Sequence, residues 1–499
     1  MAGIPGWRLR ARLALAFGLG AVMATGQAPL GFWWFTLAGL AGVTALVVQA
    51  AGARQAAWLG LFAGTGYFTL ALSWIVEPFL IDIARHGWMA PFALLLMAFG
   101  LALFWAAAAG LAVSVAPGRR ALLFAVLLSA AELLRGYVLT GFPWALIGHV
   151  WIGWAPAQLA AWLGPGGLTL VTALAAILPV AWRGRGRVRG LAASAMLLGA
   201  VAGFGVLRLA ATPPEAPGVT LRLVQPNADQ RTKWQPGMAD MLFDRQLDFT
   251  AALPRPDLVI WPETAVPYLL ERSQGALDAI AFASGGVPVI TGIQRGEDAR
   301  FWNSMVVIGP EGRVQGLYDK HHLVPFGEYI PYGDTMARLF GITAFAARQG
   351  NGYSAGPGAA VLDLGARLGK VLPLICYEAV FPQDLRAAPE RADWIVQITN
   401  DGWFGTLTGP YQHLAQARLR AIEQGLPLVR VANTGVSGVI DAHGRILATI
   451  PLGEAAYIDA SLPGALPPTP YARFGEVPLL LLLAALMAAL LRLPRRSIA

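Results

Sequence analysis

Long apolar stretches fill the first part of the chain, up to about residue 210, and one more lies near its end. Each is about 18–25 residues long, which is enough for a helix to cross a hydrocarbon core about 30 Å thick. The first stretch follows several arginines, as a signal peptide does, but six more stretches come directly after it, so we interpret it as a retained helix. We therefore predict about eight transmembrane helices, near residues 11–28, 31–50, 56–76, 91–115, 119–136, 164–182, 188–210 and 477–493.

The basic residues between these stretches predict their orientation, because cytoplasmic loops of membrane proteins are rich in Lys and Arg. With a cytoplasmic N-terminus, the short outer loops carry only Arg85 and Arg135, and both termini lie inside. Residues 211–474 then lie outside, which in a bacterium is the periplasmic side of the inner membrane. The inner segments hold Arg8, Arg10, Arg12, Arg54, Arg119, Arg120, Arg183, Arg185, Arg187, Arg189, Arg492, Arg495 and Arg496.

The segment 211–474 has a different pattern, with short β-like runs alternating with amphipathic helices and polar turns. Such a mixture indicates one layered α/β domain. We predict a membrane domain of about seven helices at 1–210, this α/β domain at 211–474, and a last helix with a basic cytoplasmic tail at 475–499. The expected helices are 238–253 and 411–424, and the expected strands are 219–225, 257–261, 287–293, 303–308, 313–318, 368–375, 394–399, 428–432 and 438–440.

The amino-acid composition supports a membrane protein and argues against a nucleic-acid-binding or a disulfide-stabilised protein. Of the 499 residues, 56% are hydrophobic and 13% are charged, whereas soluble domains are about a quarter charged. The sequence pI near 9.9 comes from arginines clustered between apolar stretches, so it reflects topology and does not indicate nucleic-acid binding. A single cysteine, Cys376, excludes an internal disulfide, and a lone thiol outside the cytoplasm suggests a chemical role.

Three short segments of the α/β domain carry reactive side chains where β-like runs end: Trp261-Pro262-Glu263, the segment from Tyr318 to Glu328, and Leu374-Ile375-Cys376-Tyr377-Glu378. Taken singly, each has a simpler explanation. Glu263 and Lys320 would be solvated surface charges, and Cys376 would be a small, inert core residue. His321 and His322 suggest a metal, but no third ligand stands at a telling spacing, so we predict neither a metal nor a cofactor.

Taken together, the three segments resemble the nitrilase, or carbon-nitrogen hydrolase, superfamily, with Glu263, Lys320 and Cys376 in the family's order and at similar intervals. That resemblance implies an αββα sandwich in which the three side chains meet. Over nearly the whole chain, the sequence is similar to the membrane-embedded apolipoprotein N-acyltransferase family. The segments that carry this closer resemblance are "KHHLVPFGEYIP" from Lys320, "KWQP" with Trp234, "WPETAVP" with Glu263, "CYE" at 376–378, and Gly141-Phe142-Pro143-Trp144.

The resemblance implies a function and roles for the matching residues. The chain would transfer a fatty acyl group from a glycerophospholipid, through a Cys376 thioester, to the amine of a diacylglyceryl-modified apolipoprotein. Glu263 would act as general base and acid and Lys320 would stabilise the oxyanion. Glu328 would orient Lys320, unless it is a surface group. The supporting residues implied by the family are Trp234, Glu328, Tyr377 and Glu378, although packing alone also explains Tyr377, and Trp234 is either a core aromatic or a lid over the acyl chain.

Two other functions fit parts of the sequence. A membrane-tethered amidase would use the same three side chains on a small amide, but about eight spans exceed what a tether needs. A transporter or scaffold with a degenerate nitrilase-like domain should carry polar groups deep in several spans, and here the spans are almost free of charge. We also interpret the glycine-flanked apolar stretch 339–345 as a lid that admits lipid, with an ordinary buried helix as the alternative.

Overall fold

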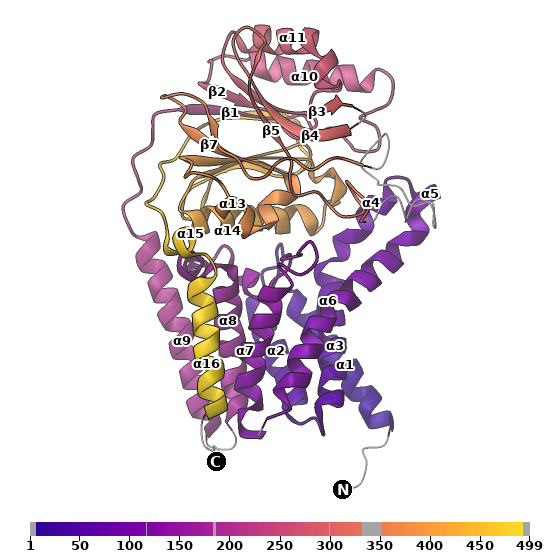
Figure 1. The fold of residues 1–499 in the computed structure, drawn as a ribbon, viewed down its shortest axis with the longest axis vertical. Helices are drawn as coiled ribbons and strands as arrows, with labels where there is room; N and C mark the ends of the chain where they lie inside the picture. The colour runs from indigo at the N-terminus through magenta and orange to yellow at the C-terminus, as the bar shows by residue number, and fades with distance from the viewer. Residues whose placement is uncertain (1–5, 116, 183–185, 299, 332–351, 493–499) are drawn as a thin grey trace. The chain divides into compact units, whose positions relative to one another are not determined.

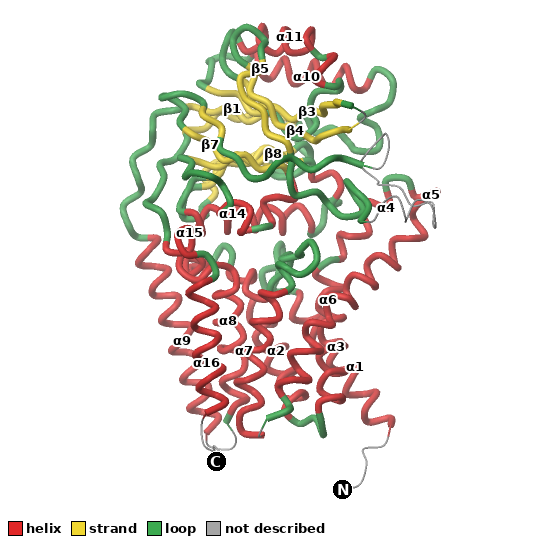
Figure 2. Tube along the Cα trace, in the orientation of Figure 1, coloured by secondary structure: helices red, strands yellow, loops and turns green. Residues whose placement is uncertain are grey.

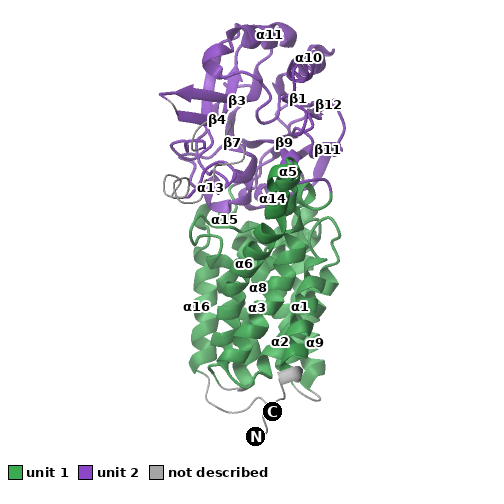
Figure 3. Ribbon diagram, turned by 90° about the vertical axis from the view of Figure 1, so that its right-hand side faces the viewer, with its two compact units in different colours: residues 1–212, 407–419, 468–499 green, residues 213–406, 420–467 purple. Residues whose placement is uncertain are grey.

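The structure is a computed structural model that describes residues 6–115, 117–182, 186–298, 300–331 and 352–492 (Figure 1). The stretch 339–345 that we interpreted as a lid lies outside the described residues. The chain divides into two compact units (Figure 3). Unit one comprises Met1–Thr212, Leu407–Leu419 and Pro468–Ala499, and unit two comprises Pro213–Thr406 and Arg420–Pro467.

Unit one is helical, and a helix lies at each of the eight places where we expected a span. Among the described residues, three helical segments are long and apolar enough to cross a membrane: Ile83–Ala112, Ala155–Ala181 and Gly186–Leu209. A pair bent by 64°, Ala53–Ala71 with Ser73–Leu80, would make a fourth. The eight helices are α1 (Gly6–Ala24), α2 (Trp33–Val48), α3 (Ala53–Ala71), α6 (Ala90–Ala112), α7 (Arg120–Leu134), α8 (Ala160–Ala181), α9 (Gly186–Leu209) and α16 (Val477–Arg492).

One buried ion pair fixes the end of α7 within unit one. Arg135 Nη2 lies 2.9 Å from Glu132 Oε2, and both side chains are fully buried. The indole of Trp105 donates a hydrogen bond of 2.7 Å to the same carboxylate. Arg135 also donates to the carbonyls of Trp144 and Ala145, at 2.9 and 3.2 Å. These hydrogen bonds reduce the free-energy cost of burying the two charges. They also hold the loop that carries Trp144 against α7.

Unit two contains two six-stranded sheets (Figure 2). The first has the order β12-β1-β2-β3-β4-β5, and the second has the order β11-β10-β9-β8-β7-β6. The first sheet is built from β1 (Thr220–Gln225), β2 (Leu258–Ile260), β3 (Val289–Glu297), β4 (Arg300–Ile308), β5 (Val314–Asp319) and β12 (Ala456–Ser461). The second is built from β6 (Leu362–Asp363), β7 (Lys370–Ile375), β8 (Trp394–Thr399), β9 (Leu428–Ala432), β10 (Ser437–Ile440) and β11 (Ile446–Ile450).

Helices cover the outer face of the first sheet, as Figures 1 and 2 show for α10 (Met238–Ala251) and α11 (Gln274–Ser284). Their apolar faces bury Phe243, Leu277 and Ile280 against Val259 and Trp261 of the sheet. The short α13 (Pro382–Arg386) and the end of α14 (Gly409–Gln424) belong to the second sheet's side of the domain. This layering agrees with the predicted sandwich, although α11, β6, β11 and β12 were not expected from the sequence.

The parallel arrangement of the central strands determines where the reactive residues lie. Strands β1, β2 and β3 run parallel in the first sheet, and β7, β8 and β9 run parallel in the second. Ligand sites of such sheets lie at the carboxyl ends of the strands, where side chains of successive strands meet. Glu263 follows β2, Cys376 follows β7, and Asn400 follows β8, so all three emerge at carboxyl ends.

Candidate active site

Glu263 lies on a tight turn after β2. Its neighbour Thr264 has a φ of 51°, and the turn passes so close to Gly292 that a Cβ there would lie 2.6 Å from the Glu263 Cα. The side chain is 7% exposed. Asn303 Nδ2 donates to Oε1 at 2.6 Å, and the backbone N–H of Asn400 donates to Oε2 at 2.8 Å. Burial raises the pKa of Glu263 above its ordinary value, and the positive charge of Lys320 opposes that rise only in part.

Lys320 follows β5 directly, and its backbone N–H donates to the Asn303 carbonyl at 2.9 Å. Its Nζ lies 2.8 Å from Glu328 and 4.0 Å from Glu263. Burial alone would lower the pKa of Lys320, but its electrostatic interactions with Glu328, then with Cys376 and Glu263, outweigh that effect and raise it. Lys320 is therefore a fixed, buried ammonium group, which fits a role in stabilising negative charge.

Cys376 lies at the junction between β7 and the short helix Cys376–Val380. Its φ of 51° is rare for a residue with a side chain, and such strain is concentrated at functional sites. Burial, followed by the charge of Glu263, raises the pKa of the thiol, whereas Lys320 and a hydrogen bond with Thr399 act in the opposite direction. The thiol therefore keeps its proton at rest and needs a base when it reacts.

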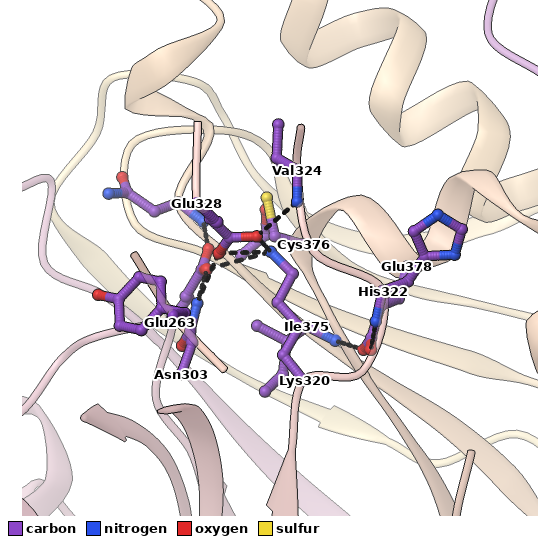
Figure 4. Close-up of polar contacts among 12 residues, drawn as sticks. Glu263, Asn303, Lys320, His322, Val324, Glu328, Ile375, Cys376 and Glu378 are labelled. Atoms are coloured by element: carbon purple, nitrogen blue, oxygen red, sulfur yellow. Dashed lines mark hydrogen bonds and ion pairs between the residues drawn. The ribbon is translucent and has the colours of Figure 1, made fainter. Parts of the chain in front are cut away.

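The structure brings Glu263, Lys320 and Cys376 together: Figure 4 shows the Lys320 ammonium beside the Glu263 carboxylate, and both groups act electrostatically on the Cys376 thiol. A nucleophile, a carboxylate with a raised pKa and a fixed cation are the groups that acyl transfer through a covalent intermediate needs. The three residues come from both sheets of unit two, so the site depends on the sandwich being assembled.

Glu378 joins the loop of Lys320 to the loop of Cys376. Its Oε1 accepts hydrogen bonds from the Tyr318 hydroxyl at 2.7 Å and from the backbone N–H groups of His321 and His322 at 2.8 and 3.2 Å. Its Oε2 accepts from the Ile375 N–H at 2.7 Å. Burial alone would raise the pKa of Glu378, but these donors and the charge of His321 lower it. Glu378 thus holds both loops with one carboxylate.

Glu328 performs a similar task on the other side of Lys320. Besides its contact with the ammonium group, it accepts from the Val324 N–H at 2.9 Å and from Asn303 Nδ2 at 3.2 Å. Only 5% of the residue is exposed, so the alternative of a surface glutamate is wrong.

The two aromatic residues that the sequence pointed to lie in different surroundings. Tyr377 is buried and packs edge-on against Phe381, with ring centroids 4.8 Å apart. Trp234 is half-buried and lines a cavity of about 30 Å³ together with Glu263 and Gln246. The Lys233 ammonium lies 5.0 Å from the centre of the Trp234 ring. Trp234 therefore borders the site and is no core residue.

A buried polar network beneath Cys376 was not expected from the sequence. Gln397 Nε2 donates to the Cys376 carbonyl at 3.1 Å, and Thr399 donates to Asp401 at 3.0 Å. Asp401 forms an ion pair with Arg430, which in turn donates to Gln397 at 2.7 Å. The signal available was the run "TNDG" after the strand at 394–399, where polar residues follow a buried strand. Asn303 was also missed, because it lies inside a strand and gives no motif.

The two histidines contact carboxylates. His321 Nδ1 lies 2.9 Å from Glu378, and His322 Nδ1 lies 2.8 Å from Asp384. The His322 ring also stacks on Phe381 with centroids 3.6 Å apart. Within the described ranges, no group of three or more His, Cys, Asp or Glu side chains is arranged to hold a metal ion.

Comparisons with known proteins find matching family models and similar chains. Residues 250–467 match the family model for carbon-nitrogen hydrolases, and residues 19–178 match the one for the apolipoprotein N-acyltransferase N-terminal domain. The chain is 39% identical to an apolipoprotein N-acyltransferase of Caulobacter vibrioides, over 97% of this chain and 95% of that relative. It is 41% identical to one of Bradyrhizobium diazoefficiens, over 89% and 87%. Among solved structures, a mutant of the Nesterenkonia AN1 amidase from the nitrilase superfamily is 15% identical over 54% of this chain and 98% of that one, with a TM-score of 0.37.

Proposed function

Because the chain belongs to the apolipoprotein N-acyltransferase family, we propose that it moves a fatty acyl chain from a membrane glycerophospholipid to the N-terminal amine of a diacylglyceryl-modified apolipoprotein. The reaction would run in two half-reactions through a thioester on Cys376. The observation that carries the proposal is the position of the Lys320 ammonium, 4.0 Å from Glu263 and electrostatically coupled to the Cys376 thiol.

In the first half-reaction, the Cys376 sulfur attacks the carbonyl carbon of the phospholipid ester while Glu263 takes the thiol proton. Lys320 stabilises the negative charge on the carbonyl oxygen of the tetrahedral intermediate, and losing one such donor typically costs about 2.7–4 kcal/mol of barrier. The ester C–O bond then breaks. Glu263 returns its proton to the leaving glycerol oxygen, so a lysophospholipid departs and a thioester remains.

In the second half-reaction, the amine of the acceptor attacks the thioester carbon. Glu263, again ionised, takes a proton from the amine nitrogen, and Lys320 stabilises the second tetrahedral intermediate. The C–S bond breaks and the sulfur recovers the proton from Glu263. The products are an amide on the lipoprotein and the starting thiol, so protons and electron pairs balance without a cofactor.

We further propose the membrane arrangement in which this reaction takes place. The eight helices at the expected spans would all cross the bacterial inner membrane, with both termini cytoplasmic and the domain at 211–474 periplasmic. Support comes from the arginine pattern and from the helices at each expected span. The periplasm lacks ATP and acyl-CoA, so an ester already present in a membrane lipid is a suitable acyl donor there.

Mass spectrometry of the intact protein after incubation with bilayer lipid would test the proposal. We expect one fatty acyl adduct, located on Cys376, that disappears when a diacylglyceryl-cysteine peptide is added. Cys376→Ala should carry no adduct, and Cys376→Ser should retain a stalled ester. An amidase would release ammonia from small amides and form no lipid-derived adduct, and a transporter or scaffold would do neither. Either outcome would overturn the proposal.

A further inference from the structure

A second cavity, of about 310 Å³, is lined entirely by residues of unit one. Pockets for small ligands typically begin at about 300 Å³, so this one has room for a headgroup and not for a whole diacyl lipid. Its walls come from three stretches of the chain, all of them in unit one. They are residues 26–31, the loop 144–154, and one side of residues 411–418 of α14.

The charge of the lining favours an anion. Arg418 supplies a positive charge, and none of the lining residues is an aspartate or glutamate. The guanidinium packs against Gly153, where a Cβ would lie 3.4 Å from Nη1 and where φ is +98°. A flat guanidinium recognises phosphate oxygens through paired hydrogen bonds, which makes Arg the usual residue for phosphate recognition.

The same cavity presents a hydrogen-bond acceptor. Gln416 is 2% exposed, and its Nε2 donates to the Gln412 carbonyl at 3.4 Å. Among the residues that the structure describes, no donor reaches the buried Gln416 Oε1. The neighbouring amide of Gln412 is already engaged, since it accepts from the Trp144 indole at 2.7 Å and donates to the Ala71 carbonyl at 3.0 Å. A buried acceptor without a donor costs about 1–3 kcal/mol, and a ligand that carries a donor would remove that cost.

Aromatic residues beside the cavity indicate its depth in the bilayer. Trp33 packs against Trp151 and Trp154, with ring centroids 5.1 and 6.5 Å apart. Trp154 lines the cavity and is 51% exposed. Tryptophans gather at the level of lipid headgroups, where their rings face the acyl region and their N–H groups face water. In the proposed membrane arrangement, the exposed Trp154 would place the cavity at the level of lipid phosphate esters.

From these observations we infer that the cavity binds the phosphate-bearing headgroup of a glycerophospholipid. Arg418 pairs with the phosphate, and Gln416 Oε1 accepts a hydrogen bond from the ammonium or hydroxyl group of the headgroup. The inference rests on the proposed function, which requires a phospholipid donor, and it assigns to that donor class a binding site made of unit-one residues.

The test uses the full chain with Cys376→Ala in nanodiscs, so that binding is measured without turnover. The probe is dioleoyl phosphatidylethanolamine with a photoreactive diazirine on its headgroup, and cross-linked peptides are mapped by mass spectrometry. We expect labels within 144–154 and 411–418. Arg418→Gln should lower the yield there about tenfold, as loss of one charge-assisted contact predicts, and Arg418→Lys should retain part of it.

Further variants and probes separate the alternatives. Arg85→Gln, which removes an exposed arginine of unit one outside the cavity, should label like the parent. Gln416→Leu should weaken labelling while thermal unfolding shows an intact fold. Equal labelling by a diacylglycerol that carries the same diazirine, or unchanged labelling of Arg418→Gln, would overturn the inference. Protection by inorganic phosphate without any lipid label would point to a free-phosphate site and would overturn it too.

The two proposals can fail separately. A fatty acyl adduct on Cys376 of the unmodified chain, without headgroup labels at the cavity, would leave the proposed function standing and remove this site. Headgroup labels at the cavity without any adduct on Cys376 would support this site and overturn the proposed function.

Discussion

Asn303 Nδ2 donates a hydrogen bond of 2.6 Å to Oε1 of Glu263. The same amide donates to Glu328 at 3.2 Å, so one neutral side chain separates two buried carboxylates. Asn303 also bonds through its backbone carbonyl to the Lys320 N–H. The proposed general base is thus held by a residue that does not itself react.

We predict that Asn303→Leu shifts the acid limb of the pH–rate profile for Cys376 acylation upward. The raised pKa of Glu263 means that activity falls with decreasing pH as this carboxylate becomes protonated. Removing a donor that stabilises the charged form raises the pKa further, by about one unit if the bond contributes about 1.5 kcal/mol. Stopped-flow acylation between about pH 5 and 9 would measure it. Gln315→Leu, at an exposed position of β5, is the matched control and should keep the parental profile. An acid limb of Asn303→Leu at the parental pH would contradict the assignment of Glu263 as the general base.

Replacing Glu378 should loosen both loops of the site. In Glu378→Gln the charge is lost and the amide nitrogen faces the Ile375 N–H, so we expect a loss of stability on the order of 3 kcal/mol. Because the pKa of Glu378 is lowered in the folded state, its contribution is present above the ordinary value near 4.3 and disappears as the pH falls through the lowered pKa. Thermal unfolding in detergent should show that the difference in stability between Glu378→Gln and the parent becomes smaller at acidic pH. Glu311→Gln, an exposed glutamate, should show no gap, and a pH-independent gap for Glu378→Gln would count against this reading.

Gly292 is expected to control the position of Glu263. A methyl group there would lie 2.5 Å from the Thr264 nitrogen and 2.6 Å from the Glu263 Cα, and both are backbone atoms that a side-chain rotation cannot move. A displacement on the order of 1 Å costs about 10²-fold in rate, which we predict for acylation by Gly292→Ala. The control is Gly275→Ala, in α11, where a methyl group meets nothing within 4 Å. Parental acylation rates in Gly292→Ala would show that the turn has room to adjust.

The Thr399 hydroxyl should tune the Cys376 thiol. At rest it donates to Asp401 at 3.0 Å, and turning its hydrogen toward the sulfur would stabilise the thiolate and lower the pKa of the thiol. Thr399→Val removes that effect, so the thiolate should form at higher pH and alkylation by iodoacetamide should slow several-fold at a fixed pH. Thr399→Ser keeps the hydroxyl and should alkylate like the parent. If serine and valine behave alike, the hydroxyl has no part in thiol ionisation.

The sequence placed Glu263 and Cys376 each after a buried β-like run, and their meeting was implied by the family resemblance. Carboxyl ends of parallel strands meet at one edge of a sheet, but β2 and β7 belong to different sheets, so strand pairing alone does not bring these two residues together. Lys320 follows an antiparallel strand, and only the resemblance of its surrounding motif to a known family indicated that it belongs to the same site.

Asn303 could not be found in this way, because its place beside Glu263 depends on the register of β4 against β3 and β5. That register comes from side-chain packing over the whole sheet, and no local pattern encodes it. The network of Arg430, Asp401 and Gln397 was not predicted from the sequence for a related reason. A buried arginine between apolar residues looks like part of an edge strand until its partners on neighbouring strands are known.

Spans and helices differed in how well they could be predicted. Apolar length located the helices of unit one, yet α2 and α16 are each 16 residues long, so length and composition alone do not establish that they cross a bilayer. The strand β12 was missed because its residues alternate between half-buried and exposed, and it is recognisable only as the antiparallel partner of β1.

That pairing has a consequence for how the protein is made. Thr220 of β1 lies opposite Ser461 of β12, which is synthesised close to the end of the chain. Until the ribosome has released that late segment, the nascent domain carries β1 with one edge open. Quality-control proteases that recognise unpaired strands therefore have a long interval in which to act. Any truncation before residue 456 should yield degraded chains instead of a smaller stable enzyme.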